Sequence, residues 1–297
     1  MADNIGATTV LTSNEYSDTR GLCGDPAPFT QAVINGLAHG GGLYVPAELP
    51  TLSLDDICDL AKLPYAKRAA FVYRAFGVDL PAERIESLME SAYGTQFDDE
   101  DICPITSLDD KTHVLELWHG PTSAFKDMAL QCLPRFFSAS AEKLASEGKL
   151  DHDFLILVAT SGDTGKAALE GFKDADHVRI GVLYPDGGTS DIQRKQMVTQ
   201  EGENVQVWGV RGNFDDCQTG VKNAFSDEEF AAKLLAEHNV TLSSANSINW
   251  GRLMPQIVYY LSGYAKLVEA GKVKAGDPID VCVPTGNFGN ILAAWYA

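Results

Sequence analysis

The sequence predicts an α/β protein in which parallel, open sheets carry helices on both faces and follow a mainly helical N-terminal segment. From Leu115 onward, short apolar runs alternate with stretches of helical periodicity, an order typical of parallel sheets with crossover helices. Small-residue and glycine-rich loops follow the apolar runs, and ligands of such folds bind at the carboxyl ends of strands. Residues 1–100 show helical spacing without these loops, which predicts the separate segment.

The N-terminal segment is expected to pack as a helical layer without chemistry of its own. Apolar residues recur at helical spacing in four stretches, and an acidic break at 98–101 ends the pattern. We expect helices at residues 28–37, 54–63, 66–76 and 81–93.

Strands and helices alternate through the rest of the chain. The apolar runs predict strands at residues 114–118, 154–158, 178–183, 205–210 and 279–283. The periodic stretches predict helices at residues 164–172 and 192–201, a helix ending at 225, a long helix at 254–268 and a last helix after 290.

The chemistry centres on residues 119–127, HGPTSAFKD, directly after an apolar run. The glycine–proline pair at 120–121 predicts a turn, and Thr122 or Ser123 can cap the next helix. Lys126 then lies in the first turn of that helix. A lysine held out of bulk water loses proton affinity and becomes a usable amine nucleophile. A solvated helix lysine is the alternative.

Two loops have the form of anion-binding helix starts. Residues 286–290, GNFGN, follow a predicted strand and open a helix, so the glycines admit an anion to the first N–H groups. An ordinary strand-to-helix turn is the alternative there. Residues 160–166, TSGDTGK, form a second such start. They are not a nucleotide P-loop, because Thr160 stands in place of the first glycine and Ala167 in place of the hydroxyl residue.

A third polar stretch, residues 246–252, precedes the long apolar-faced helix. Arg252 suits the planar recognition of phosphate. Helix capping by Asn246 or Ser247 is the alternative reading of this stretch.

Other charged residues are assigned structural roles. Asp215 and Asp216 precede a predicted helix and fit N-capping, so we assign no metal site. His119 is expected to shape the turn before Lys126 rather than to transfer protons.

Taken in order, these stretches resemble the motifs of threonine synthases, which are pyridoxal-phosphate (PLP) enzymes. Six stretches match family motifs, and together they span essentially the whole chain: residues 17–21, 41–46, 119–127, 159–165, 246–253 and 284–290. The resemblance implies a PLP fold type II architecture, similar to tryptophan synthase β. It implies an N-terminal helical segment at 1–100, a large PLP-binding domain from 101–150 and 246–297 that is incomplete at its C-terminus, and a small α/β domain at 151–245.

The resemblance also implies the site residues. Lys126 is expected to be the catalytic residue and to hold the cofactor, pyridoxal 5'-phosphate. The cofactor phosphate is expected at Gly286, Asn287, Phe288, Gly289 and Asn290. Asp163 is expected beside the ring oxygen of the cofactor, where a carboxylate needs a shared proton.

The substrate is expected to meet two further groups of residues. The resemblance assigns the substrate α-carboxylate to Ser161, Gly162 and Thr164. It assigns the substrate phosphate to Ser247, Asn249 and Arg252. Lys166 is a second candidate for that phosphate, with a solvated helix lysine as the alternative.

The implied activity is a lyase reaction of threonine biosynthesis. O-phospho-L-homoserine and water yield L-threonine and phosphate by γ-elimination and β-addition, with the freed Lys126 amine abstracting the Cα proton. A related PLP-dependent amino-acid dehydratase and a non-catalytic protein that keeps the fold are the alternatives. Threonine synthases of this type continue well beyond the phosphate loop, so we expect the 297 residues to be an N-terminal part.

Charge and cysteine content argue against several classes of partner. The formal net charge of −18 disfavours a nucleic-acid backbone or an anionic membrane as partner. The six cysteines show neither a zinc-site nor a disulfide spacing, so we expect reduced thiols in a cytoplasmic protein. No signal peptide or membrane-spanning run is expected. We expect a monomer or a homodimer that acts on a small-molecule substrate.

Overall fold

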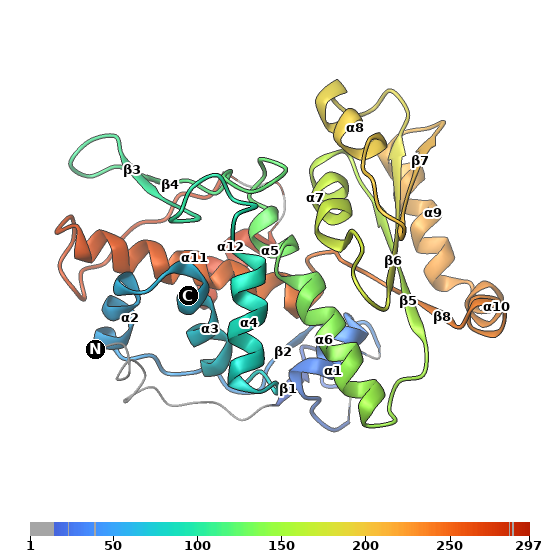
Figure 1. Ribbon diagram of the computed structural model, residues 1–297, viewed down its shortest axis with the longest axis horizontal. Coiled ribbons are helices and arrows are strands. Elements are labelled where there is room, and N and C mark those ends of the chain that lie inside the picture. Colours follow the sequence, from blue (N-terminus) through green and yellow to red (C-terminus); the bar gives the residue numbers. More distant parts are fainter. Residues whose placement is uncertain (1–14, 23, 39, 285, 287) are drawn as a thin grey trace.

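The computed structural model describes residues 15–22, 24–38, 40–284, 286 and 288–297, and Figure 1 shows a mainly helical part beside a part built on a parallel sheet. The helical part begins with a short antiparallel pair of strands, β1 and β2. Its elements up to residue 100 are β1 (Tyr16–Asp18), α1 (Phe29–Asn35), β2 (Tyr44–Pro46), α2 (Leu54–Asp59), η2 (Leu60–Lys62), α3 (Tyr65–Ala75) and α4 (Ala82–Ala92).

The expected N-terminal helices are confirmed. The stretches at 28–37, 54–63, 66–76 and 81–93 form α1, α2 with η2, α3 and α4, respectively. The apolar faces of α1, α3 and α4 are buried, as expected of apolar residues that repeat at the period of a helix, whereas α2 buries only Asp56. The antiparallel pair β1–β2 was not predicted, since three-residue strands give no measurable alternation.

A cluster of aromatic side chains joins the N-terminal segment to the later helices α6 (Leu133–Ser146) and α11 (Trp250–Glu269). The Phe29 ring lies 5.8 Å from the Tyr16 ring and 6.1 Å from the Phe136 ring, and the Tyr16 ring lies 6.0 Å from the Trp250 ring. Aromatic pairs at such distances stabilise a core by more than the apolar area that they bury. The N-terminal layer therefore shares one core with the helices that flank the lysine stretch.

The second part is a four-stranded parallel sheet with the strand order β7-β6-β5-β8. The central strands pair in register, with Ile156 opposite Ile180, and their side chains are almost fully buried. The strands are β5 (Asp153–Ala159), β6 (Val178–Pro185), β7 (Val205–Val210) and β8 (Val240–Ser243). The first three were predicted; β8 was missed because its four residues alternate too briefly to give a signal.

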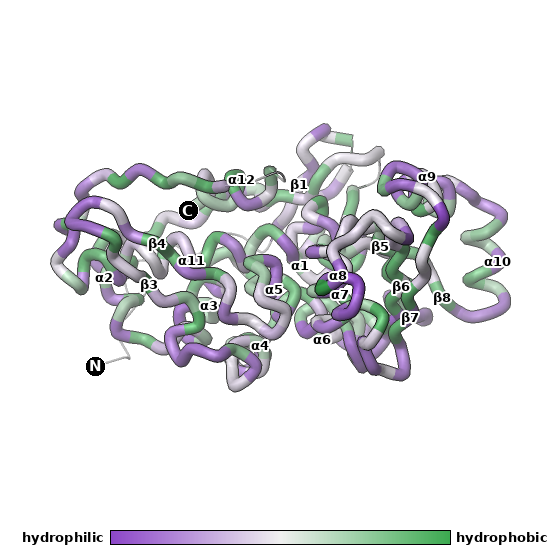
Figure 2. The backbone as a smooth tube through the Cα atoms, turned by 90° about the horizontal axis from the view of Figure 1, so that it is seen from above, coloured by the Kyte–Doolittle hydropathy of each residue, from purple (hydrophilic) through white to green (hydrophobic). Residues whose placement is uncertain are grey.

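Helices cover both sides of this sheet, as expected for parallel strands. In Figure 1, α7 and α9 lie on opposite sides of β6, and α10 lies at the far end of the molecule. The strand β6 is largely hydrophobic in Figure 2, and hydrophilic segments dominate the outer surface of the molecule. These helices are α7 (Asp163–Phe172), α8 (Asp191–Val198), α9 (Phe214–Ser226) and α10 (Glu228–His238).

Two strand predictions were wrong. Residues 114–118 do not form a buried parallel strand; β4 (His113–Leu115) pairs with β3 (Ile105–Ser107) in a half-buried antiparallel hairpin. Residues 279–283 form no strand, and Ile279 and Val281 are exposed. A strand requires a neighbour for its backbone groups, and within the described ranges none pairs with this stretch.

Among the residues that the structure describes, no helix is long and apolar enough to cross a membrane. The division into three domains stays a prediction.

Candidate functional site

Lys126 lies directly before α5 (Asp127–Leu130), in the helical backbone conformation. It occupies the N-cap position of α5, one residue before the first turn where it was expected. Capping by Thr122 or Ser123 was also wrong, because no side chain caps this helix. The Thr122 hydroxyl instead donates a hydrogen bond to Asp127, at 2.6 Å.

Asp127 closes the turn that carries Lys126. Its buried carboxylate accepts hydrogen bonds from the Thr122 hydroxyl, from the Thr122 N–H at 2.8 Å, and from the Ala124 N–H at 3.4 Å. Burial raises the pKa of Asp127, and these hydrogen bonds oppose that rise. A Cβ atom at Gly120 would lie 2.5 Å from the Asp127 Cβ, so the turn requires glycine there.

The Lys126 amine lies in a shielded, positively charged environment. Its side chain is 16% exposed, and its Nζ lies 4.0 Å from Asp163 Oδ2. Burial lowers the pKa of Lys126; the Asp163 carboxylate opposes this change, while Arg252 and Lys166 add to it. The alternative of a solvated lysine is therefore wrong. Because the pKa is lowered, a larger fraction of the amine is in its neutral, nucleophilic form than in an exposed lysine.

The loop before α7 is held by Thr160, at the end of β5. The Thr160 hydroxyl accepts hydrogen bonds from the N–H groups of Gly162 and Gly165, at 2.9 and 3.0 Å. Gly162 has a φ of 144°, which favours glycine, and a Cβ there would lie 2.1 Å from the Gln193 amide oxygen. Ser161 is left exposed at the tip of this loop.

Asp163 is the first residue of α7, and Thr164 follows it half-buried in the first turn. The Asp163 carboxylate accepts a hydrogen bond from the Gln193 amide of α8. One oxygen of the Asp163 carboxylate therefore faces Lys126, and the other accepts the hydrogen bond from Gln193 of α8. The sequence contained no signal for Gln193, because its partner is 30 residues away.

Lys166 is buried rather than solvated. Its Nζ donates a hydrogen bond to the Thr122 carbonyl at 2.8 Å and lies 3.9 Å from Asp163 Oδ1. The solvated alternative for this residue is therefore wrong. The structure places it within the group around Lys126.

The stretch 246–252 opens α11, and Asn249 is its N-cap residue. The Asn249 side-chain oxygen accepts from the Gly251 N–H at 2.9 Å, and its amide group donates to the Val33 carbonyl at 2.8 Å. Capping was expected of Asn246 or Ser247 and occurs three or two residues later. The buried Asn249 amide is thus used within the chain, while Ser247 remains half-buried beside it.

Arg252 is a buried cation with spare hydrogen-bonding capacity. It is 3% exposed, and its Nη1 donates to the Ala245 carbonyl at 2.7 Å. Its Nε has no hydrogen-bond partner among the described residues. Burial lowers the pKa of Arg252 to about 10, against the opposing effects of Tyr259 and Asp127. An anion would satisfy such a group.

The glycine-rich loop leads into α12 (Gly289–Tyr296). Asn290 is buried, and its side-chain oxygen accepts a hydrogen bond from the hydroxyl of Tyr259 and from that of Tyr260, each at 2.6 Å. Phe288 is 68% exposed, and a Cβ at Gly286 would meet no atom within 4 Å, so the described part of the loop borders open space. Asn287 lies outside the described residues.

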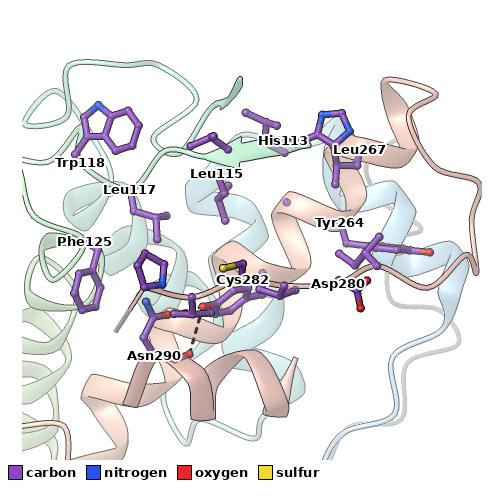
Figure 3. Close-up of a pocket in the computed structure, with 18 residues that line it drawn as sticks. His113, Leu115, Leu117, Trp118, Phe125, Tyr264, Leu267, Asp280, Cys282 and Asn290 are labelled. Carbon is purple, nitrogen blue, oxygen red and sulfur yellow. Dashed lines mark hydrogen bonds between the residues drawn. The ribbon is translucent and has the colours of Figure 1, made fainter. Parts of the chain in front are cut away.

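An apolar cavity of about 530 Å³ lies beside this group, between β4, α11 and the stretch at 279–284. Figure 3 shows Phe125 and Asn290 at one end of it and Tyr264 and His113 toward the other. Lys126 does not line the cavity. The cavity is therefore lined mostly by apolar side chains, and Asn290 is the lining residue that belongs to the glycine-rich loop.

Of the charged residues given structural roles, Asp216 takes part in capping a helix as expected, whereas the role of His119 stays a prediction. Asn213 and Asp216 form a capping box at the start of α9. The two ring nitrogens of His119 face carboxylates of Asp98 and Glu116, and the hydrogen bond with Glu116, at 2.8 Å, raises the pKa of His119 against its partial burial. Within the described ranges, no cluster of potential metal ligands occurs.

Comparisons with known proteins place these features in context. A family model described as "Threonine synthase N terminus" matches residues 15–93. The chain is 44% identical to human "Threonine synthase-like 1" over 91% of its length and 36% of that protein. It is 40% identical to "Threonine synthase" from Pseudomonas aeruginosa, over 95% of the chain and 56% of that protein.

Two solved structures are similar across nearly the whole chain. PLP-bound threonine synthase from Brucella melitensis matches with a TM-score of 0.81 and 40% identity, over 95% of this chain and 57% of that one. Threonine synthase from yeast matches with a TM-score of 0.84 and 35% identity, over 96% and 55%. The chain therefore spans about half the length of the threonine synthases that it matches, and about a third of the threonine synthase-like protein.

Proposed function

Because the chain belongs to the threonine synthase family, we propose that its protein is a PLP-dependent lyase that makes L-threonine and phosphate from O-phospho-L-homoserine and water. The observation that carries this proposal is the environment of Lys126. Its amine is shielded from water, has a lowered pKa, and faces one carboxylate and two cations. We also propose that the protein is cytoplasmic, is a monomer or a homodimer, and acts on a small-molecule substrate.

The described residues fit the cofactor that the proposal requires. Lys126 would hold the aldehyde carbon of PLP covalently. The phosphate of PLP would lie at the start of α12, where Gly286 borders open space and the helix N-terminus carries a partial positive charge. The phosphate loop is proposed as Gly286, Asn287, Phe288, Gly289 and Asn290.

Within that loop, the structure suggests how Asn290 acts. Its side-chain oxygen is held by two tyrosine hydroxyls, which leaves the amide nitrogen as the group that can donate to a phosphate. Asp163, 4.0 Å from Lys126, is proposed to lie beside the ring oxygen of the cofactor and to share a proton there.

When bound, PLP supplies an electron sink for the charge that develops at the substrate Cα. The Lys126 amine takes the Cα proton, and its lowered pKa favours the neutral form that this step needs. After the transfer, the Asp163 carboxylate stabilises the protonated Lys126 amine. A second proton, from Cβ, must also be removed before the γ-phosphate leaves, and Lys126 can take it only after giving up the first.

The two anionic ends of the substrate would bind to opposite sides of this amine. Ser161, Gly162 and Thr164, at the start of α7, would bind the α-carboxylate. Arg252, with its unpartnered Nε, and Ser247 would bind the phosphate. Asn249 would contribute indirectly, by capping the start of α11, because its side-chain oxygen and nitrogen already have hydrogen-bond partners.

The test uses the full-length protein, its Lys126→Ala variant and, as a control, Lys272→Ala at an exposed position. With PLP, the wild type and the control should develop a visible absorbance band that borohydride fixes, and the Lys126→Ala variant should not. Phosphate release from O-phospho-L-homoserine should fall roughly a thousandfold or more in Lys126→Ala, with unchanged circular dichroism. Threonine formation by a folded Lys126→Ala variant would contradict the proposal.

A second candidate is a protein that holds PLP without making threonine. The 44% identity to a protein called threonine synthase-like, rather than threonine synthase, favours keeping this candidate. A Lys126-dependent absorbance band without phosphate release would support it. Formation of a keto acid from L-threonine or L-serine would instead support an amino-acid dehydratase.

A further inference from the structure

Lys166 joins the sheet-based part of the molecule to the turn that carries Lys126. It stands in the first turn of α7, and its side chain is only 8% exposed. Its ammonium group donates to the Thr122 carbonyl, 44 residues earlier in the chain, at 2.8 Å. A buried lysine that ends on a backbone carbonyl fixes the distance between two elements, because leaving that ammonium unpaired is costly.

One carboxylate serves two lysines at this place. Asp163 Oδ2 lies 4.0 Å from Lys126 Nζ, and Asp163 Oδ1 lies 3.9 Å from Lys166 Nζ. Asp163 is half-exposed, so its charge is partly screened by water. Asp127 gives little further compensation, because its carboxylate is occupied by Thr122 and Ala124 and its pKa is raised by burial.

The charged groups that act on Lys126 come from two elements: Asp163 and Lys166 from α7, and Arg252 from α11. Arg252 has its own carbonyl partner and lies on the helical part. Lys166 is the cation that shares a carboxylate with Lys126. It therefore competes directly for the charge that would stabilise a protonated Lys126.

We infer that Lys166 is a positioning residue for Lys126, which holds the Lys126 turn against α7 and competes with Lys126 for the Asp163 carboxylate. This inference rests on the proposed function only in treating Lys126 as the reacting amine. Burial and the charge of Lys166 both lower the pKa of Lys126, which agrees with this inference.

The inference is tested on the full-length protein without PLP, by acetylating its amines with acetic anhydride over a range of pH. Mass spectrometry of the Lys126 peptide gives the midpoint at which that amine becomes reactive. In Lys166→Met, the repulsion is removed and Asp163 is free for Lys126, so the midpoint should rise by about one pH unit. In Asp163→Asn, the negative charge beside Lys126 is lost, so the midpoint should fall.

Two further variants separate charge from structure. Lys166→Arg keeps a cation and should restore most of the wild-type midpoint. Lys266→Met removes another partly buried lysine, which lies in the last turn of α11 and pairs with Asp101, and should leave the midpoint unchanged. If Lys166 had only a structural role, Lys166→Met would lower thermal stability but would leave the midpoint of Lys126 unchanged.

The inference is overturned if folded Lys166→Met keeps the wild-type midpoint, or if Asp163→Asn raises it. If Lys166→Met does not fold, Asp163→Asn still decides, because its half-exposed side chain lies at a helix start rather than in the core. The proposed function fails separately, through the absence of a Lys126-dependent absorbance band with PLP, and that result would not alter the midpoints measured without the cofactor.

Discussion

Gly120 and Asp127 are two residues whose contact sets the turn before α5. The Asp127 carboxylate accepts hydrogen bonds from both donors of Thr122, so the turn closes over a buried acidic side chain. The space for that side chain exists because Gly120 has no Cβ. The position of the Lys126 amine thus depends on a glycine six residues earlier.

We expect Gly120→Ala to lower the free energy of unfolding by about 1–3 kcal/mol, because the new methyl group would overlap the buried Asp127 side chain. The same variant should weaken PLP binding, since the turn must shift. Urea denaturation and PLP titration measure these effects. Gly220→Ala is the control: its Cβ would meet no atom within 4 Å, and alanine in α9 should raise stability by up to about 1 kcal/mol. Equal effects of both substitutions would refute the steric explanation.

The helix α11 carries a polar strip along one face of an otherwise apolar element. Arg252, Gln256 and Tyr259 follow each other at spacings of four and three residues, so they lie on the same side of the helix. The Gln256 amide donates to the Arg252 carbonyl at 3.0 Å, and the Tyr259 hydroxyl donates to Asn290 at 2.6 Å. One helix therefore positions both the buried arginine and the start of α12.

We expect the double variant Tyr259→Phe/Tyr260→Phe to weaken PLP binding about tenfold, because Asn290 loses both groups that hold its side-chain oxygen. Tyr260→Phe alone should have a smaller effect, since Tyr259 remains. The dissociation constant of PLP is the measurement. Tyr264→Phe is the matched control, because its hydroxyl contacts the backbone of Gly276 and Asp277 instead. A double variant with wild-type affinity would remove Asn290 from the proposed phosphate loop.

Across the whole molecule, the N-terminal segment is bound to the later helix α11 by more than apolar packing. Arg68 of α3 is 3% exposed and donates to the Ser262 hydroxyl of α11 at 2.6 Å, across 194 residues of sequence. It also donates to the carbonyls of Leu60, Ala61 and Leu63. This side chain therefore ties η2, α3 and α11 together.

We expect Arg68→Met to lower the free energy of unfolding by about 3 kcal/mol or more, because several buried acceptors lose their donor. Arg84→Met is the control. Its exposed ion pair with Glu142 should contribute less than about 1 kcal/mol. Chemical denaturation of both variants measures the difference. Similar losses in the two would show that Arg68 is not a link between these helices.

The sequence by itself determined the local features of this protein. Apolar periodicity predicted α1 to α4 and three of the four parallel strands, because a buried face repeats at the period of its own element. The sequence predicted that Asp215 and Asp216 cap the helix that follows, and Asp216 does take part in the capping box of α9, although the N-cap residue is Asn213. The motif around Lys126 predicted a shielded amine and carried part of the resemblance to threonine synthases.

The tertiary structure decided which of these residues meet. Lys166 contacts Thr122 across 44 residues, and Asn290 contacts Tyr259 across 31, so no local pattern could predict either pair. The stretch at 279–283 has the composition of a strand, yet the described residues offer it no partner strand. Burial, hydrogen-bond partners and the pKa of Lys126 depend on groups brought together by folding, and periodicity reports only the element in which it occurs.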